Sequence, residues 1–371
     1  MRGLPRMDDA ARALLHALRE PSRLSGCPPL VLTELLGRAR NCALLGRLAA
    51  RARRAGVMST LHPRLAEHFR AALIQAEAHQ RMAKFEINRL QRALGALGDG
   101  MILLKGAAYV AAGLPAAEGR HSGDVDLLLP KSRLPAVEAS LMAKGWVQEY
   151  QADYTQDYYR LWMHELPPLR HATRLSVVDI HHTILPATNR LQPDAAALIA
   201  AAVPVPGLPG VRMLDAPDMI LHLAAHLAQD GDFSHSLREV VDLDDLLRHF
   251  ASRPGFWAEL LRRADHHRLG RPLHYAIAMS RALLDTPVPA DTILALRHFA
   301  LPSPLDRLVR AMMAASLAAS GRSAVDAPTR FCREALYIRS HWLRMPPLML
   351  ARHLGRKSLM RLQAALRPST P

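Results

Sequence analysis

The sequence predicts an α+β protein in which a small sheet with its own helices is flanked by helical regions. On both sides of residues 99–190, Ala-, Leu- and Arg-rich segments carry apolar residues at helical spacing. Within residues 99–190, short apolar runs end at Gly or Pro, as in "MILLKG" and "DVDLLLP", and such runs are typical of buried strands. We therefore expect a helical N-terminal region, a core, a helical domain packed on the core and a basic helical C-terminal tail, over residues 1–98, 99–190, 191–320 and 321–371.

The N-terminal region is expected to be helical from residue 7 to residue 97. The segment Val31–Gly56 has apolar residues at helical spacing and ends on glycine, a frequent helix stop. The segment Leu65–Leu97 continues the same pattern without a break, which predicts one long helix.

The core is expected to begin with a strand at Met101–Gly106 and a short helix in "AAYVAAG". A second strand starts at Asp124. The segment "SRLPAVEASLMAKG" then predicts a helix that Ser132 caps and Gly145 ends. Further strands are expected at Trp146–Glu149, Tyr158–His164 and Arg174–Thr183.

Helical patterns return at Asp215, where "DAPDMILHLAAHLAQ" places Pro217 in the first turn of a helix. The segment "SLREVVDLDDLLRHF" predicts the next helix. Asp242 falls on the apolar stripe of that helix, where it could pair with His226 or with an arginine.

The three cysteines and the hydropathy pattern exclude some classes of protein. Cys27, Cys42 and Cys332 are far apart and match neither a zinc motif nor a disulfide framework. The most apolar stretch, Ala195–Val211, is too short for a membrane span and contains three prolines. We expect a cytoplasmic protein with reduced thiols and no transmembrane segment.

The net charge of +15 is concentrated at the two ends of the chain. Residues 1–100 hold 17 Lys/Arg against 8 Asp/Glu, and residues 301–371 hold 12 against 3. These basic flanks could contact RNA or an anionic membrane surface, or they could simply be solvated helix faces. The same alternatives apply to the mixed basic and apolar segment Trp342–Arg361.

Two aspartates share one face of the expected strand in "SGDVDLLLP". Side chains alternate along a strand, so Asp124 and Asp126 point to one side, while Val125 and Leu127 point to the other. Two adjacent carboxylates in a dry site need a cation, and oxygen ligands suit Mg²⁺ or Mn²⁺. An isolated Asp-x-Asp is a weak signal, because exposed strands carry such pairs by chance.

A third carboxylate strengthens the interpretation. In "RLSVVDIHHTI", Asp179 lies at the centre of another strand pattern and shares a face with His181. If that strand pairs beside the first, Asp179 completes a three-carboxylate site with Asp124 and Asp126, and His181 could contact nucleotide or metal-bound water.

An anion-binding turn is expected upstream of these acids. In "LLKGAAYVAAG", Lys105-Gly106 ends a strand and opens a helix, where backbone N–H groups and the lysine charge favour a phosphate. Arg120, four residues before Asp124, is a second candidate for phosphate contact.

The order of these motifs resembles the DNA polymerase β-type nucleotidyltransferase superfamily. The details "LLKG", "DVDLLL", "VVDIHHTI" and "LHLAAH" are most similar to its uncharacterised nucleotidyltransferase branch, which is found in bacteria, often near polysaccharide genes. The strong motifs cover residues 101–185. The resemblance implies Mg²⁺ (or Mn²⁺) on Asp124, Asp126 and Asp179, and the triphosphate of an NTP at Lys105 and Gly106. In most of the superfamily a serine or glycine follows this glycine, whereas this chain has Ala107.

The resemblance implies transfer of an NMP from an NTP to a hydroxyl or phosphate acceptor. A small molecule, a sugar phosphate, RNA or a protein all remain open as acceptors. The absence of a hydroxyl at Ala107 keeps a second function open, in which the protein retains the fold as a non-catalytic nucleotide-binding or assembly module.

Overall fold

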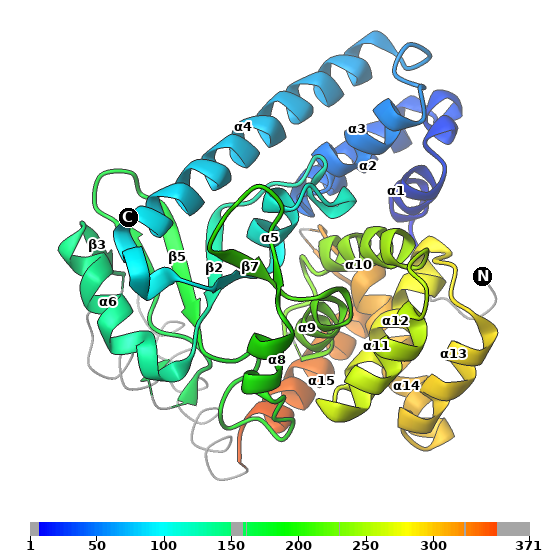
Figure 1. Cartoon of the computed structure of the whole chain (residues 1–371). Helices are drawn as coiled ribbons and strands as arrows, with labels where there is room; N and C mark the ends of the chain where they lie inside the picture. The colour runs from blue at the N-terminus through cyan, green and yellow to red at the C-terminus, as the bar shows by residue number, and fades with distance from the viewer. Residues whose placement is uncertain (1–6, 150–158, 161, 230, 323, 347–371) are drawn as a thin grey trace, which may run out of the picture.

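The chain folds as an α+β protein, as predicted, with a sheet at one end and helices over the rest (Figure 1). The computed structural model describes residues 7–149, 159–160, 162–229, 231–322 and 324–346. Residues 150–158 and most of the mixed basic and apolar segment Trp342–Arg361 lie outside the described residues.

Within the described residues, seven strands form one mixed sheet. Their order across the sheet is β3-β4-β5-β2-β1-β7-β6. The strands are β1 (Met101–Leu103), β2 (Asp124–Leu128), β3 (Trp146–Gln148), β4 (Leu169–His171), β5 (Val177–His181), β6 (Val203–Pro204) and β7 (Val211–Met213). The strands expected near residues 101, 124, 146 and 174 are therefore confirmed, whereas β4, β6 and β7 were not predicted.

The centre of the sheet pairs β2 with β5 in parallel and β1 with β2 in antiparallel fashion. The β2–β5 register sets Asp126 directly opposite Asp179. Val125 and Leu127 of β2 are buried on the other face, as the alternation of the strand requires.

The expected strand at Tyr158–His164 is wrong. Tyr159 and Arg160 are helical, and pairing begins only at Glu165, which forms an isolated bridge with His181. Pro167 and Pro168 follow after Leu166, and because proline has no N–H to donate, the pairing with β5 is interrupted until β4 begins at Leu169.

From residue 7 onward, the N-terminal region contains the α-helices α1 (Asp9–Arg19), α2 (Pro29–Asn41), α3 (Leu45–Arg54) and α4 (Pro63–Leu94). The long helix α4 runs from these helices across to the sheet, as Figure 1 shows, and at 1.5 Å per residue it is about 48 Å long. It buries an apolar stripe that includes Phe69, Leu73, Ile87 and Leu90, and it packs on β2 and on the core helices.

In the described part of the core, the helices include α5 (Lys105–Ala111) and α6 (Leu134–Ala143). Ser132 does not cap α6. It lies in a 3₁₀ turn, Lys131–Arg133, which delays the start of the helix to Leu134, and Gly145 follows its end at φ +93°.

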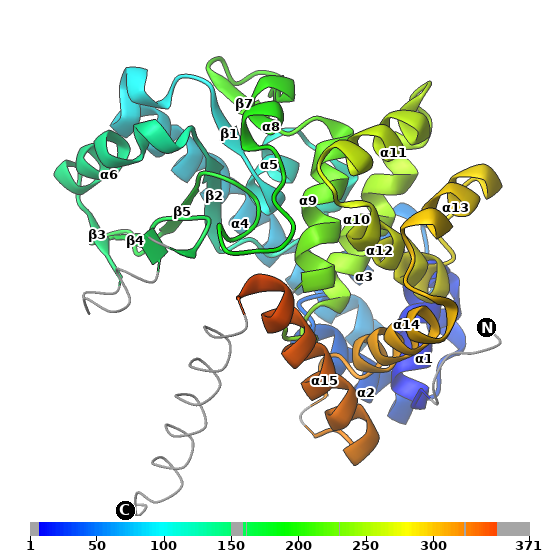
Figure 2. The same cartoon turned by 90° about the horizontal axis from the view of Figure 1, so that it is seen from below.

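The remaining helices form a body beside the sheet, which Figure 2 shows from below. They are α8 (Ala195–Ala201), α9 (Ala216–Gln229), α10 (Leu237–Phe250), α11 (Phe256–His266), α12 (Gly270–Leu284), α13 (Ala290–Leu296), α14 (Ser303–Ala318) and α15 (Ala327–Arg344). Helix α9 is buried almost all round because α10, α11 and α12 pack against it. None of the described helices combines the length and hydropathy needed to cross a bilayer.

Buried ion pairs join the N-terminal region, the core and the helical body. We call them the arginine–aspartate network, and its members are Arg47, Arg51, Arg120, Asp242, Asp244 and Asp245. Arg51 lies 3.0 Å from Asp244 and 2.8 Å from Asp245, and Arg47 pairs with Asp245. The network ties α3 to α10, two helices about 200 residues apart in sequence.

Candidate active site

The three predicted aspartates meet on one face of the sheet, where β2 and β5 run side by side. Asp126 and Asp179 are register partners, and Asp124 precedes them at the start of β2. Asp124 is exposed, Asp179 is partly buried and Asp126 is 4% exposed. We call Asp124, Asp126 and Asp179 the three-aspartate site.

Two donors hold Asp126. The Lys105 ammonium Nζ lies 3.1 Å from Oδ1, and His181 Nε2 lies 3.0 Å from the same oxygen. Burial alone would raise the pKa of Asp126, but the charge of Lys105 and the hydrogen bond from His181 outweigh it and hold the pKa well below its usual range. The carboxylate is therefore ionised at neutral pH. In the same way, the charge of Asp126 outweighs burial and raises the pKa of Lys105.

Asp179 lacks such compensation. Burial, followed by the charges of Asp126 and Glu165, raises the pKa of Asp179 to about 7. Its Oδ1 is buried and has no hydrogen-bond partner among the described residues. An unpartnered carboxylate oxygen beside two other carboxylates is a group that a divalent cation would satisfy.

The turn between β1 and α5 presents Lys105 to this face. Lys105 has φ +43°, a left-handed conformation that is unusual for a residue with a side chain. The next residue, Gly106, has no room for a side chain. A Cβ there would lie 2.1 Å from Arg120 Nη1 and 2.8 Å from Ser122 Oγ. Ala107 is buried at the next position and offers no hydroxyl.

Arg120 does not occupy the expected position. Its side chain is buried, and Nε donates to Asp242 at 3.0 Å while Nη1 donates to Ser122 at 2.9 Å. A guanidinium held in this way supports the turn at Gly106 from within the protein, so we do not assign it a phosphate contact. Asp242 was expected to pair with His226 or with an arginine, and its partners are arginines: Arg120 at 3.0 Å and Arg47 at 3.5 Å.

His181 lies beneath the carboxylates and is 1% exposed. Through Nε2 it orients Asp126, and its Nδ1 lies 3.2 Å from Glu165 Oε2. Glu165 and its neighbour His164 were not predicted as site residues, because His164 was expected to end a strand and Glu165 to follow it. The sequence feature that could have indicated them is "MHELPP". Its two prolines interrupt strand pairing soon after Glu165, and such an interruption near an acid is a sign of a site residue.

Helices α9 and α10 supply further titratable groups near Lys105. His226 Nδ1 lies 3.0 Å from Glu239, which holds the pKa of that carboxyl below its usual range against the effect of burial. Burial, together with the charge of Lys105, lowers the pKa of His222 well below its usual value, so its ring is neutral at pH 7.

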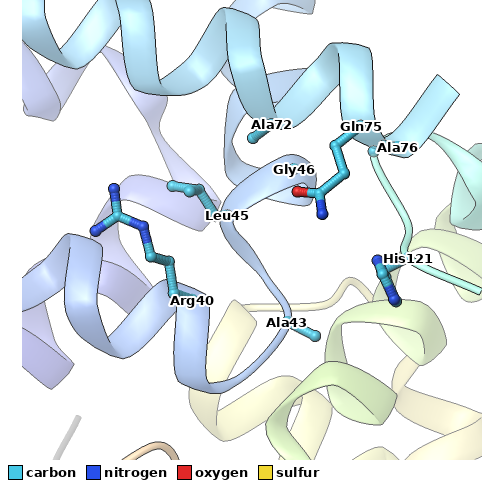
Figure 3. A pocket seen from close by; sticks show the side chains of 9 residues that line it. Arg40, Ala43, Leu45, Gly46, Ala72, Gln75, Ala76 and His121 are labelled. Carbon is cyan, nitrogen blue, oxygen red and sulfur yellow. The ribbon is translucent and has the colours of Figure 1, made fainter. Parts of the chain in front are cut away.

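A separate hollow of about 340 Å³ lies between α3, α4 and the loop before β2. Arg40, Gln75 and His121 are among the side chains that line it, as Figure 3 shows. One wall is formed where Gly46 meets Gly119, and a Cβ on Gly46 would lie 2.3 Å from the Gly119 carbonyl oxygen. The hollow therefore depends on a glycine–glycine contact between the N-terminal region and the loop that leads to Asp124.

Sequence comparison identifies a family for this chain. A family model described as "Uncharacterised nucleotidyltransferase" matches residues 31–285, which include the sheet, α9, α10 and the N-terminal helices from α2 onward. A search of curated protein sequences found no significant match to the chain.

Proposed function

We propose, for a chain that belongs to the uncharacterised nucleotidyltransferase family, that the three-aspartate site transfers an NMP from an NTP to an acceptor hydroxyl or phosphate. The observation that carries this proposal is the β2–β5 register, which places Asp126 beside Asp179. The negative charge gathered there exceeds the positive charge that Lys105 and His181 can supply. Such a surplus suits Mg²⁺ or Mn²⁺, which prefer oxygen ligands.

Asp124, Asp126 and Asp179 would hold the cations. All three offer carboxylate oxygens on one face, and the unpartnered Oδ1 of Asp179 supports the fit. When bound, divalent cations in such a site neutralise charge on the transferring phosphoryl group and on both the attacking and leaving oxygens.

Lys105 and Gly106 would bind the triphosphate. The ammonium of Lys105 already lies on the aspartate face, where it neutralises Asp126. With cations on the carboxylates, this ammonium would be free to pair with a phosphate oxygen instead. Its positive charge can stabilise the phosphate that a serine hydroxyl at position 107 would otherwise contact.

The remaining steps are positioning and proton acceptance. Asp179 has a pKa of about 7 before any cation binds, and its carboxylate lies where it could accept a proton from the attacking hydroxyl. His181 would keep Asp126 in place through the Nε2 hydrogen bond. In-line attack at the α-phosphorus would then release pyrophosphate, with the protein acting through orientation and charge.

The test is a labelling experiment. The purified protein is incubated with each α-labelled NTP, Mg²⁺ or Mn²⁺ and cell extract, and the labelled product is sorted into small molecule, RNA and protein. We expect one class to become labelled by the wild type and not by Asp126→Asn. If RNA is the acceptor, its binding should weaken steeply with salt, because basic residues release counterions from phosphates.

A protein that binds NTP in the presence of Mg²⁺ but labels nothing and releases no pyrophosphate would contradict transfer. That outcome would instead support a nucleotide-binding module, the function that the missing hydroxyl at Ala107 favours.

A further inference from the structure

We propose that His164, Glu165 and His181 form a second metal site, which binds a transition-metal cation of the Zn²⁺ class. The site lies next to the three-aspartate site but uses different residues and a different donor set. It rests on the geometry of these three side chains and is independent of the proposed transferase activity.

The backbone fixes the three residues together. Glu165 forms a β-bridge with His181, and the flanking bonds run from Leu166 N to the Ile180 carbonyl (2.9 Å) and from His182 N to the His164 carbonyl (2.8 Å). Neighbouring side chains on two paired segments are thereby held at one point on the sheet. The site is thus built on paired backbone and does not depend on a free loop.

The separations of the donor atoms suit a small tetrahedral ion. One ligand atom from each of His164, Glu165 and His181 lies within 4.8 Å of the other two. His181 Nδ1 lies 3.2 Å from Glu165 Oε2, and His164 Nε2 lies 4.0 Å from the same oxygen. Ligands at 2.0–2.1 Å from a tetrahedral zinc ion are about 3.3 Å apart, so the His181–Glu165 edge is already formed and the His164–Glu165 edge must shorten by less than 1 Å.

An unpartnered nitrogen of His181 points to a ligand. The buried Nδ1 of His181 has no hydrogen-bond partner in the described part of the chain, although Glu165 Oε2 is only 3.2 Å away. The oxygen therefore lies off the line along which a ring N–H would donate. An ion bound by both atoms produces that arrangement, because each donor points at the ion and not at the other donor.

The other side of the His181 ring strengthens the assignment. Its Nε2 lies 3.0 Å from Asp126 Oδ1, so an Nε2–H would donate a hydrogen bond to that carboxylate. The unprotonated Nδ1 would then have a lone pair available for a metal ion. Histidines that bind metals commonly donate their second N–H to a carboxylate in this way, which orients the ring and increases its basicity. The same hydrogen bond would couple an ion at His181 to the position of Asp126.

The donor set distinguishes the two sites. Three carboxylates suit hard cations such as Mg²⁺, whereas two imidazoles with one carboxylate suit Zn²⁺ and its neighbours. Three protein ligands also leave a fourth position open, as in catalytic zinc sites.

The test is Zn²⁺ binding to the full-length protein, measured against a coloured zinc chelator with millimolar Mg²⁺ present to occupy the three-aspartate site. We expect one tight Zn²⁺ per wild-type chain. Glu165→Gln and His164→Gln should each weaken it more than about 10-fold, because even loss of a second-shell partner costs about 10- to 100-fold. Co²⁺ should give the visible bands of a four-coordinate site in the wild type and lose them in both variants.

Two matched variants serve as controls. His182→Gln removes the adjacent histidine and should leave Zn²⁺ binding unchanged, as should Asp179→Asn, which alters the three-aspartate site. Circular dichroism checks that each variant is folded, and two independent ligand variants guard against the failure of one. Absence of tight Zn²⁺ binding, or binding that survives both ligand variants, or binding lost in Asp179→Asn and kept in Glu165→Gln, would overturn the proposal.

Discussion

Two groups of aspartates in this molecule differ in how their charges are balanced. In the arginine–aspartate network, three aspartates of α10 face three arginines, and each acid has a guanidinium within about 3 Å. On the sheet, the three-aspartate site and Glu165 face Lys105 and His181. The aspartates that pair with arginines join elements of the fold. The carboxylates that outnumber their cations repel one another, and a structural role alone does not account for them. The imbalance separates the functional candidates from the structural acids.

The largest expected effect comes from unbalancing the network. Asp242→Asn leaves the buried Arg120 without a carboxylate and removes one of the two carboxylates beside Arg47, and we expect the free energy of unfolding to fall by about 3–5 kcal/mol. Urea unfolding measures the change. As a control, Asp124→Asn at the exposed start of β2 should stay within about 0.5 kcal/mol of the wild type. Equal losses in the two variants would remove the distinction between the groups.

A change of opposite sign is expected on the sheet. The pKa of Asp179 is about 7 in the folded protein against 3.8 in the unfolded chain. Its favourable contribution is therefore complete below pH 3.8 and is lost as the pH rises to about 7. In EDTA at pH 8, Asp179→Asn should be more stable than the wild type by at least about 1.4 kcal/mol, the equivalent of one pKa unit.

Mg²⁺ should reverse that order. Added Mg²⁺ should stabilise the wild type against thermal unfolding more than it stabilises Asp179→Asn, because the cation neutralises the surplus carboxylates. A variant that is less stable than the wild type in EDTA would argue that Asp179 is already satisfied by the protein.

A smaller effect is expected at His222, which packs in α9 near Lys105. Its pKa in the folded protein lies below the 6.5 of the unfolded chain, so its contribution to stability is complete above pH 6.5 and is lost as the pH falls. The loss is at most about 1.4 kcal/mol for each pH unit below 6.5. His222→Leu should make stability flatter between pH 7 and pH 5 in urea titrations. An unchanged slope would mean that His222 takes up its proton in the folded state.

The local part of this arrangement could be predicted from the sequence. The alternation of "DVDLLL" and the apolar runs identify β1, β2 and β5, and they place Asp124, Asp126 and Asp179 on one face, because these features depend on neighbouring residues. Gly106 was predicted as part of an anion-binding turn, and the structure adds a packing reason for the glycine, because Arg120 and Ser122 leave no room for a side chain.

The partners of these residues could not be predicted in the same way. Arg120 and Asp242 are 122 residues apart, and nothing local shows that the arginine turns inward toward α10 and away from the sheet face. Strand β6 at the edge of the sheet and its neighbour β7 are two and three residues long, too short for an alternation to be recognised. Glu165 enters the site through one bridge to His181, a contact set by the fold as a whole.

The most direct test of the central claim is pyrophosphate release from NTP by the wild type and by Asp126→Asn, each with and without Mg²⁺. The account predicts Mg²⁺-dependent release by the wild type and a loss of about 1,000-fold or more in the variant, since metal ligation contributes several kcal/mol to the transition state. The variant should retain the circular dichroism of the folded protein. Equal release by the two folded proteins would contradict the assignment of Asp126 and, with it, the function proposed for this site.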